Sequence, residues 1–181
     1  MRPPMYRYLL AFILLTGCAR DKPLQVLGSV PAFQLTNQQG QVFSSSALEG
    51  HVWVADFIFT NCQGPCPRMS SHMRALQNKT DAAIQLVSFT VDPDRDTPPV
   101  LTAYAKQFGA DASRWSFLTG DKATLNTLDR DAFKLGNLGA EMDHSTRFVL
   151  VDKKGQIRGY YGIAEGDPVA KIAHDAARLE L

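Results

Sequence analysis

The sequence is poor in cysteine, and it has no charge bias, no internal repeat and no low-complexity tract. Three cysteines occur among 181 residues, and a chain of this length can bury a core without disulfide staples. The 19 basic and 18 acidic residues nearly cancel, so no strong field points to nucleic acid or to an acidic substrate. The length allows one domain of ordinary size with some additional chain.

The N-terminus carries an apolar run that is far too short to span a bilayer. Arg2 and Arg7 precede "LLAFILL", which ends at Leu15, whereas a membrane-spanning helix needs about 20 apolar residues. A basic start followed by a short apolar stretch is typical of an export signal. The run ends in "LTGC" at Cys18. This ending resembles the bacterial lipobox, in which small residues precede a cysteine that is lipidated and becomes the mature N-terminus.

These features predict a lipoprotein, with an ordinary signal peptide and an incidental cysteine as the alternative. We expect a signal peptide over residues 1–17, a polar tether over 18–28 and one folded domain over 29–181. Lipid on Cys18 would hold the domain in the bacterial cell envelope, facing the periplasm or the extracytoplasmic side. If lipid takes Cys18, only two cysteines remain for the domain, where an oxidising environment allows a close pair to form a disulfide.

Strand and helix patterns alternate along the folded region. Alternation of this kind predicts an α/β domain, with a central mixed sheet, helices on both faces and an N-terminal β-hairpin extension. The expected elements are a hairpin around "NQQG", a helical turn at 44–48, a strand at 51–60, a helix from about 67 to 78, a strand at 83–91, a helix capped by Thr97 and ended by Gly109, a helix at 123–135, the strands "TRFVLVD" and "QIRGYYG", and a closing helix at 168–179.

The two remaining cysteines lie in "FTNCQGPCPRM", between a buried strand and the next helix. This is the arrangement of thioredoxin-like folds. The helix N-terminus is expected to lower the thiol pKa, and the thiolate both attacks disulfides and binds metal. A static disulfide between Cys62 and Cys66 would close too small a loop to stabilise much. Three intervening residues let the sulfurs separate beyond the ~2.05 Å of a disulfide, which leaves room for a soft metal.

A third ligand would decide between these chemistries, and His144 is the strongest candidate. It lies in "EMDHSTRFVLVD", just before a predicted strand. In thioredoxin enzymes this loop carries a cis-proline that faces the cysteines, but no proline occurs in residues 136–166. His144 can therefore face the pair, and two thiolates with one imidazole suit copper. The alternative is a histidine that is merely hydrogen-bonded in a loop. His72 falls on the first helix, and His174 is expected at the surface of the last one.

Several motifs together resemble the Sco/SenC family of copper-binding, thioredoxin-like proteins, over roughly Val30 to Leu179. They are "FQLTNQQGQVFSSSALEG", "VWVADFIFTNCQGPCPRM", "VSFTVDPDRDTP" and "DHSTRFVLVDKKGQI". The C-x-x-x-C pair alone would be weak, but with "VDPDRDTP" and the later His-Ser it is highly specific. Family members often have C-P-x-x-C, and Gln63 replaces that proline here.

The resemblance implies that Cys62, Cys66 and His144 are ligands for Cu(I) and Cu(II). The same cysteines would form a redox-active disulfide when oxidised. It also implies that "VDPDRD" lies near the site, where Asp92 could orient His144 or a partner. For Asp94 and Asp96, a role near the site and a role as turn and cap residues of this loop are equally good interpretations.

Two functions follow from this reading. The first is a membrane-anchored copper metallochaperone, which delivers copper to a respiratory enzyme such as cytochrome c oxidase or to another copper protein. The second is a thiol–disulfide oxidoreductase that reduces the acceptor's copper-site cysteines, in which Cys62 attacks and Cys66 resolves. His144 and the missing cis-proline favour the first. A peroxidase of the peroxiredoxin type is disfavoured, because its T-x-x-C spacing does not match Thr60 and Cys62.

Overall fold

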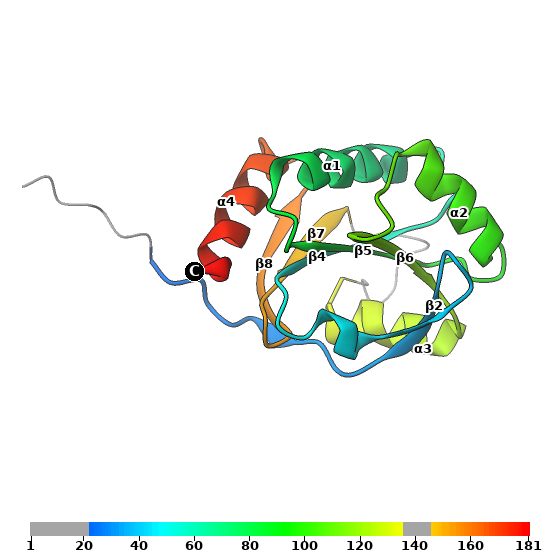
Figure 1. The fold of residues 1–181 in the computed structure, drawn as a ribbon, viewed down its shortest axis with the longest axis horizontal. Coiled ribbons are helices and arrows are strands. Elements are labelled where there is room, and N and C mark those ends of the chain that lie inside the picture. Colours follow the sequence, from blue (N-terminus) through cyan, green and yellow to red (C-terminus); the bar gives the residue numbers. More distant parts are fainter. Residues whose placement is uncertain (1–21, 136–145) are drawn as a thin grey trace, which may run out of the picture.

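A mixed β-sheet with helices on both faces forms the frame of the protein in this computed structural model, which describes residues 22–135 and 146–181 (Figure 1). Its eight described strands lie in the order β1-β8-β7-β4-β5-β6-β2-β3. The strands are β1 (Gly28–Ser29), β2 (Gln34–Asn37), β3 (Val42–Ser44), β4 (Trp53–Ile58), β5 (Gln85–Thr90), β6 (Trp115–Thr119), β7 (Arg147–Val151) and β8 (Gln156–Gly162). The helices are α1 (Pro65–Lys79), α2 (Pro98–Gln107), α3 (Lys122–Thr127) and α4 (Pro168–Glu180), with short η1 (Ser45–Leu48) and η2 (Leu128–Ala132).

The centre of the sheet is parallel because helices connect its strands. β4 pairs in parallel with β5, and β5 with β6, and α1 and α2 are the crossovers that such pairing requires. All six residues of β4 are buried, as expected for a strand covered on both faces. The hairpin β2–β3 extends one side of the sheet by antiparallel pairing of β2 with β6.

Two apolar cores lie on the two faces of the sheet. Helices α1, α2 and α4 cover one face, and α3 lies on the other (Figure 1). The α3 face is held by an aromatic cluster, in which the ring centroids of Phe57 and Phe89 are 4.9 Å apart and those of Phe57 and Phe133 are 5.3 Å apart. The other face buries Met69 and Met73 of α1, so both thioether side chains are part of the apolar core.

The α/β class, the hairpin and the helices on both faces are confirmed, whereas several details differ from the sequence prediction. Helix α1 begins at Pro65 rather than near 67, because a proline is well tolerated at the first helical position. Strand β6 was not predicted. The helix expected over 123–135 is divided into α3 and a π-helical turn, η2. Thr97 occupies the N-cap of α2 without a side-chain capping bond, and Gly109, with φ of 62°, follows the helix end.

The chain enters the domain at the end where β4 begins. Gly28 pairs with Ile157 in β8, Ile157 pairs with Val151, and Val151 pairs with Trp53 at the start of β4. The segment before β1 is bonded to β8 and α4. The Arg158 guanidinium donates to the Leu24 carbonyl, and the Arg178 guanidinium donates to the Lys22 carbonyl. Among the described residues, no helix is both long and apolar enough to cross a bilayer. Cys18 lies outside these residues.

Candidate functional site

The two cysteines lie where β4 passes into α1, on a connection that we call the cysteine loop (residues 59–64). Cys62 belongs to this loop and Cys66 to the first turn of α1. Gly64 is the N-cap of α1 and has no side chain to cap it. The Cys66 backbone N–H instead points at the Cys62 sulfur, with an N-to-Sγ distance of 3.5 Å. Both thiols are free, and their residues are 7% and 0% exposed. The predicted placement of the pair is therefore confirmed.

Burial is the main influence on the pKa of Cys66, the more deeply buried cysteine of the pair. It raises the pKa of the Cys66 thiol to about 12, with further increases from the hydrogen bond to Cys62 and from the Asp56 charge, while a backbone hydrogen bond at Phe59 acts in the opposite direction. The expected lowering by the helix N-terminus therefore does not prevail at Cys66. The free energy lost by taking a thiolate out of water exceeds what the helix end returns.

A buried carboxyl lies on the same sheet face as the pair. Side chains alternate along a strand, so Asp56 faces α1 together with its neighbours Val54 and Ile58 in that core. The Ser88 hydroxyl donates to Asp56 Oδ1 over 2.5 Å, and Trp115 Nε1 donates to that hydroxyl over 3.0 Å. Asp56 Oδ2 is buried and has no hydrogen-bond partner among the described residues. Burial accordingly raises the pKa of Asp56 to about 7, against the lowering effect of Ser88. Sequence reasoning missed this residue, although it is the one charge in the strand "HVWVADFIFT".

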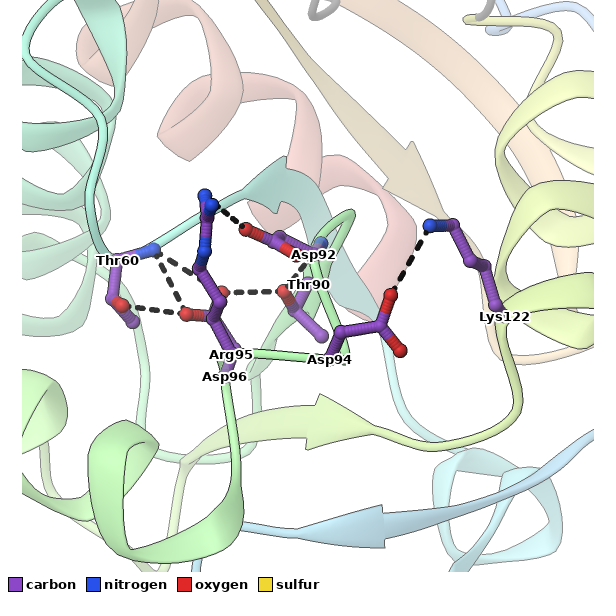
Figure 2. A network of polar contacts seen from close by, with 7 residues as sticks. All are labelled: Thr60, Thr90, Asp92, Asp94, Arg95, Asp96 and Lys122. Atoms are coloured by element: carbon purple, nitrogen blue, oxygen red, sulfur yellow. Dashed lines mark hydrogen bonds and ion pairs between the residues drawn. The ribbon is translucent and has the colours of Figure 1, made fainter.

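A second buried carboxylate joins the cysteine loop to the end of β5 (Figure 2). Asp96 is 1% exposed. It accepts from the Thr60 hydroxyl over 2.5 Å and from the Thr60 backbone N–H over 3.1 Å. Its other hydroxyl donor is Thr90, over 2.5 Å. Asp96 therefore connects the two segments "FTNC" and "VDPDRDTP". The N-cap of α2 is Thr97, so Asp96 is not the cap residue, and no pattern in the sequence indicates that it is buried.

The other two aspartates of "VDPDRDTP", Asp92 and Asp94, form ion pairs with solvent-accessible cations. Asp92 Oδ2 lies 3.3 Å from Arg95 Nη1, and Asp94 Oδ2 lies 3.3 Å from Lys122 Nζ (Figure 2). The Asp92 backbone N–H donates to the Thr90 hydroxyl over 3.0 Å, which brings it close to the Asp96 network. The role predicted for Asp92 toward His144 stays a prediction, because His144 lies outside the described residues.

The remaining described histidines show no convergence on the thiols. His72 stacks on Phe148 with a centroid distance of 6.0 Å, and its buried Nδ1 has no hydrogen-bond partner among the described residues. Burial first, and then the Arg68 charge, lower the pKa of His72. His174 is exposed on α4, as predicted. Within residues 22–135 and 146–181, no three His, Cys, Asp or Glu side chains form a group that could hold a metal. The two adjacent free thiols nevertheless form a soft donor pair of the kind that suits Cu(I).

Comparison with known proteins places the chain in a family. Residues 23–179 match the SCO1/SenC family model. The chain belongs to the SCO1/SenC family. Among solved structures, it is similar to a SCO1/SenC family lipoprotein from Bacillus anthracis, with 38% identity and a TM-score of 0.76, covering 87% of this chain and 98% of that one. The resemblance in sequence is thereby confirmed.

Two further structures of this family bear on chemistry. BsSco, described as a member of the Sco family of cytochrome c oxidase assembly proteins and as containing a disulfide switch, shares 34% identity and a TM-score of 0.76, over 86% of this chain and 96% of its own. Yeast Sco1 with copper bound shares 25% identity and a TM-score of 0.69, over 83% of this chain and 89% of its own. These likenesses confirm the thioredoxin-like fold of the Sco proteins for this chain.

Proposed function

We propose that this SCO1/SenC protein is a copper metallochaperone that carries copper to a respiratory copper enzyme such as cytochrome c oxidase. The observation that carries the proposal is the pair of free thiols, with the Cys66 N–H directed at the Cys62 sulfur at the start of α1. Copper bound to yeast Sco1 and the oxidase-assembly description of BsSco support it. The proposed ligands are Cys62, Cys66 and His144, and the cargo is Cu(I) or Cu(II).

The unequal burial of the thiols suggests an order of copper release. Cys66 is fully buried, whereas Cys62 retains 7% exposure and has the exposed neighbours Asn61 and Gln63. An acceptor thiolate would therefore replace Cys62 first and Cys66 last. A site with so few ligands favours such exchange, because an incoming sulfur can bind before an outgoing one leaves.

The closeness of the thiols also favours a second candidate, a thiol–disulfide oxidoreductase. In this reaction the Cys62 thiolate attacks a disulfide of the acceptor, forms a mixed disulfide and expels one acceptor thiolate. Cys66 then attacks the Cys62 sulfur and expels the second thiolate. The acceptor gains two electrons and the protein is left with a Cys62–Cys66 disulfide. The disulfide switch described for BsSco is consistent with this chemistry.

We further propose that lipid on Cys18 anchors the protein in the bacterial cell envelope with its domain on the extracytoplasmic side. The basis is the "LTGC" ending of the short apolar run. The similar Bacillus anthracis protein is a lipoprotein, which supports this assignment.

Copper titration of the reduced chain and its variants tests the proposed function. We expect His144→Ala to weaken Cu(II) binding by at least about tenfold, or 1.4 kcal/mol. Cu(I) binding should change less, because two thiolates can hold Cu(I) alone. Reactivity toward a small disulfide should barely change, whereas Cys62→Ser or Cys66→Ser should abolish both activities. His174→Ala, an exposed histidine on α4, is the matched control and should bind Cu(II) like the parent.

Two results would contradict this assignment. Parent-like Cu(II) binding by His144→Ala would remove His144 from the ligand set and make His72 the next histidine to replace. A parent protein that binds no copper, yet reduces disulfides rapidly, would establish the oxidoreductase instead.

A further inference from the structure

Thr60 provides the polar attachment of the cysteine loop to the loop that follows β5, while Cys62 and Phe59 pack in the apolar core. One backbone bond closes the loop on itself, from the Cys62 N–H to the Phe59 carbonyl over 3.3 Å. Thr60 attaches it to the rest of the domain, because both its backbone N–H and its hydroxyl donate to Asp96. Only one residue lies between Thr60 and Cys62, so we expect a displacement of Thr60 to disturb the position of the Cys62 sulfur relative to the Cys66 N–H.

Asp96 is itself held in place by backbone bonds of its own loop. Its N–H donates to the Asp92 carbonyl over 2.9 Å, which folds residues 92–96 into a tight turn. The next residue, Thr97, is the N-cap of α2, and the Leu101 N–H donates to its carbonyl over 2.9 Å. The Thr90 hydroxyl adds a fixed point at the end of β5. The carboxylate therefore connects the cysteine loop to the end of β5 and the start of α2.

We propose that Asp96 is the positioning residue of the cysteine pair: through Thr60 it holds the cysteine loop so that the Cys62 and Cys66 sulfurs converge on one metal or on each other. This inference rests on the proposed function of the pair, and it adds a residue that touches neither sulfur. Figure 2 shows the carboxylate between Thr60 and Thr90, apart from the outward-facing Asp94.

The chemistry of the contact explains why a carboxylate is needed. Three donors, two hydroxyls and one N–H, converge on Asp96, and an ionised acceptor makes stronger and shorter hydrogen bonds than a neutral one. An amide at this position has one acceptor atom and one donor group, so it can satisfy at most part of this set. Asp96→Asn therefore loosens the Thr60 anchor with little change in side-chain volume. Because binding sites need their ligands held within about 0.5 Å, a loosened loop weakens any chemistry that uses both sulfurs.

Two measurements on the purified full chain test this role, each on Asp96→Asn and on the matched control Asp94→Asn. The first is Cu(II) affinity by chelator competition, read by thiolate-to-copper absorption. We expect Asp96→Asn to lose about 10- to 100-fold, the range for residues that orient metal ligands. Asp94 belongs to the same loop, but its side chain is 75% exposed and its partner is the exposed Lys122, so its variant should match the parent.

The second measurement needs no metal. In a glutathione buffer, one glutathione disulfide oxidises the two thiols, which gives the Cys62–Cys66 disulfide and two molecules of glutathione. Sulfurs held close together form a disulfide more readily, because their effective concentration is higher. Asp96→Asn should therefore lower the equilibrium constant for this exchange by at least about threefold, or roughly 15 mV.

A pair of Thr60 variants separates positioning from general destabilisation. Thr60→Ser keeps the hydroxyl and should retain the parent copper affinity and disulfide equilibrium. Thr60→Val removes the hydroxyl and should shift both measurements in the same direction as Asp96→Asn. These variants decide the question if Asp96→Asn does not fold. The inference is overturned if folded Asp96→Asn, or Thr60→Val in its place, keeps parent copper affinity and parent disulfide equilibrium. If the parent binds no copper, the proposed function fails, and the disulfide equilibrium alone still decides the role of Asp96.

Discussion

Replacing the buried Asp56 by asparagine should stabilise the protein increasingly as the pH rises. Asp56 has a pKa of about 7 in the folded protein, against 3.8 for an ordinary aspartate. Below pH 3.8 the carboxyl is protonated in both states, and its contribution to stability is fully present. As the pH rises from 3.8 to 7, the unfolded chain releases the proton while the folded protein retains it, so stability is lost. Above pH 7 the loss is complete.

The size of the effect follows from the difference between the two pKa values. About three pH units correspond to about 4 kcal/mol between the extremes, and the interval from pH 5 to pH 8 contains about 2.5 kcal/mol of it. Asparagine keeps an acceptor for the Ser88 hydroxyl and is neutral at every pH. The free energy of unfolding of Asp56→Asn, relative to the parent, should therefore rise by about 2.5 kcal/mol over that interval.

Equilibrium urea unfolding at pH 5 and pH 8 measures this difference. The samples need reductant and a chelator, so that the thiols stay reduced and metal-free. Groups that titrate equally in both proteins cancel in the comparison. Asp94→Asn, which changes an exposed carboxylate, should give a constant difference from the parent. A pH-independent difference for Asp56→Asn would refute the reasoning, because it would mean that the folded protein holds Asp56 at an ordinary pKa.

Three further changes have defined outcomes. Cys18→Ser should release the protein from membranes into the soluble fraction, as seen by fractionation and blotting, because the multiply acylated anchor cannot form; a cleaved variant that stays wholly with membranes would contradict lipidation. Met69 is fully buried, so Met69→Ala should lower the free energy of unfolding by about 2–5 kcal/mol, whereas Met69→Leu should cost less than about 1.5 kcal/mol and keep copper binding. Arg114 donates to the carbonyls of Gln77, Asp81 and Ile84, so Arg114→Ala should cost about 2–3 kcal/mol in urea unfolding without altering the disulfide equilibrium.

The parts of the fold that were predictable have strong local patterns. The continuous apolar run that became β4, the proline-led start of α1 and the "KKG" turn between β7 and β8 are each determined by neighbouring residues. Strand β6 has only five residues, "WSFLT", and apolar and polar side chains do not alternate clearly along it. Its pairing with β5 and β2 is what makes it a strand, and contacts so distant in sequence are not visible in a short window.

The site shows the same division. Two cysteines between a strand and a helix predict their own neighbourhood, because the spacing and the helix start are local. Asp96 is 36 residues from Thr60 in the chain, and only the parallel pairing of β4 with β5 brings the ends of these strands together. The pKa of Cys66 was misjudged for a related reason: the helix start is visible in the sequence, but the depth of burial depends on the packing of the whole α1 face.

The attachment of residues 22–28 to the domain determines how far the cysteine loop lies from the point where the chain enters the domain. Gly28 is level with the start of β4, whereas the cysteine loop follows its end, so about 17 Å of strand separate the two. With lipid on Cys18, as predicted, the four peptide links to Lys22 span at most about 14 Å. Under the proposed anchoring the thiols would then face away from the bilayer, and the copper-binding residues of the proposed acceptor would stand well above the membrane surface. For an acceptor site at a lower level, this proposal expects the bonds from Arg158 and Arg178 to this segment to open first.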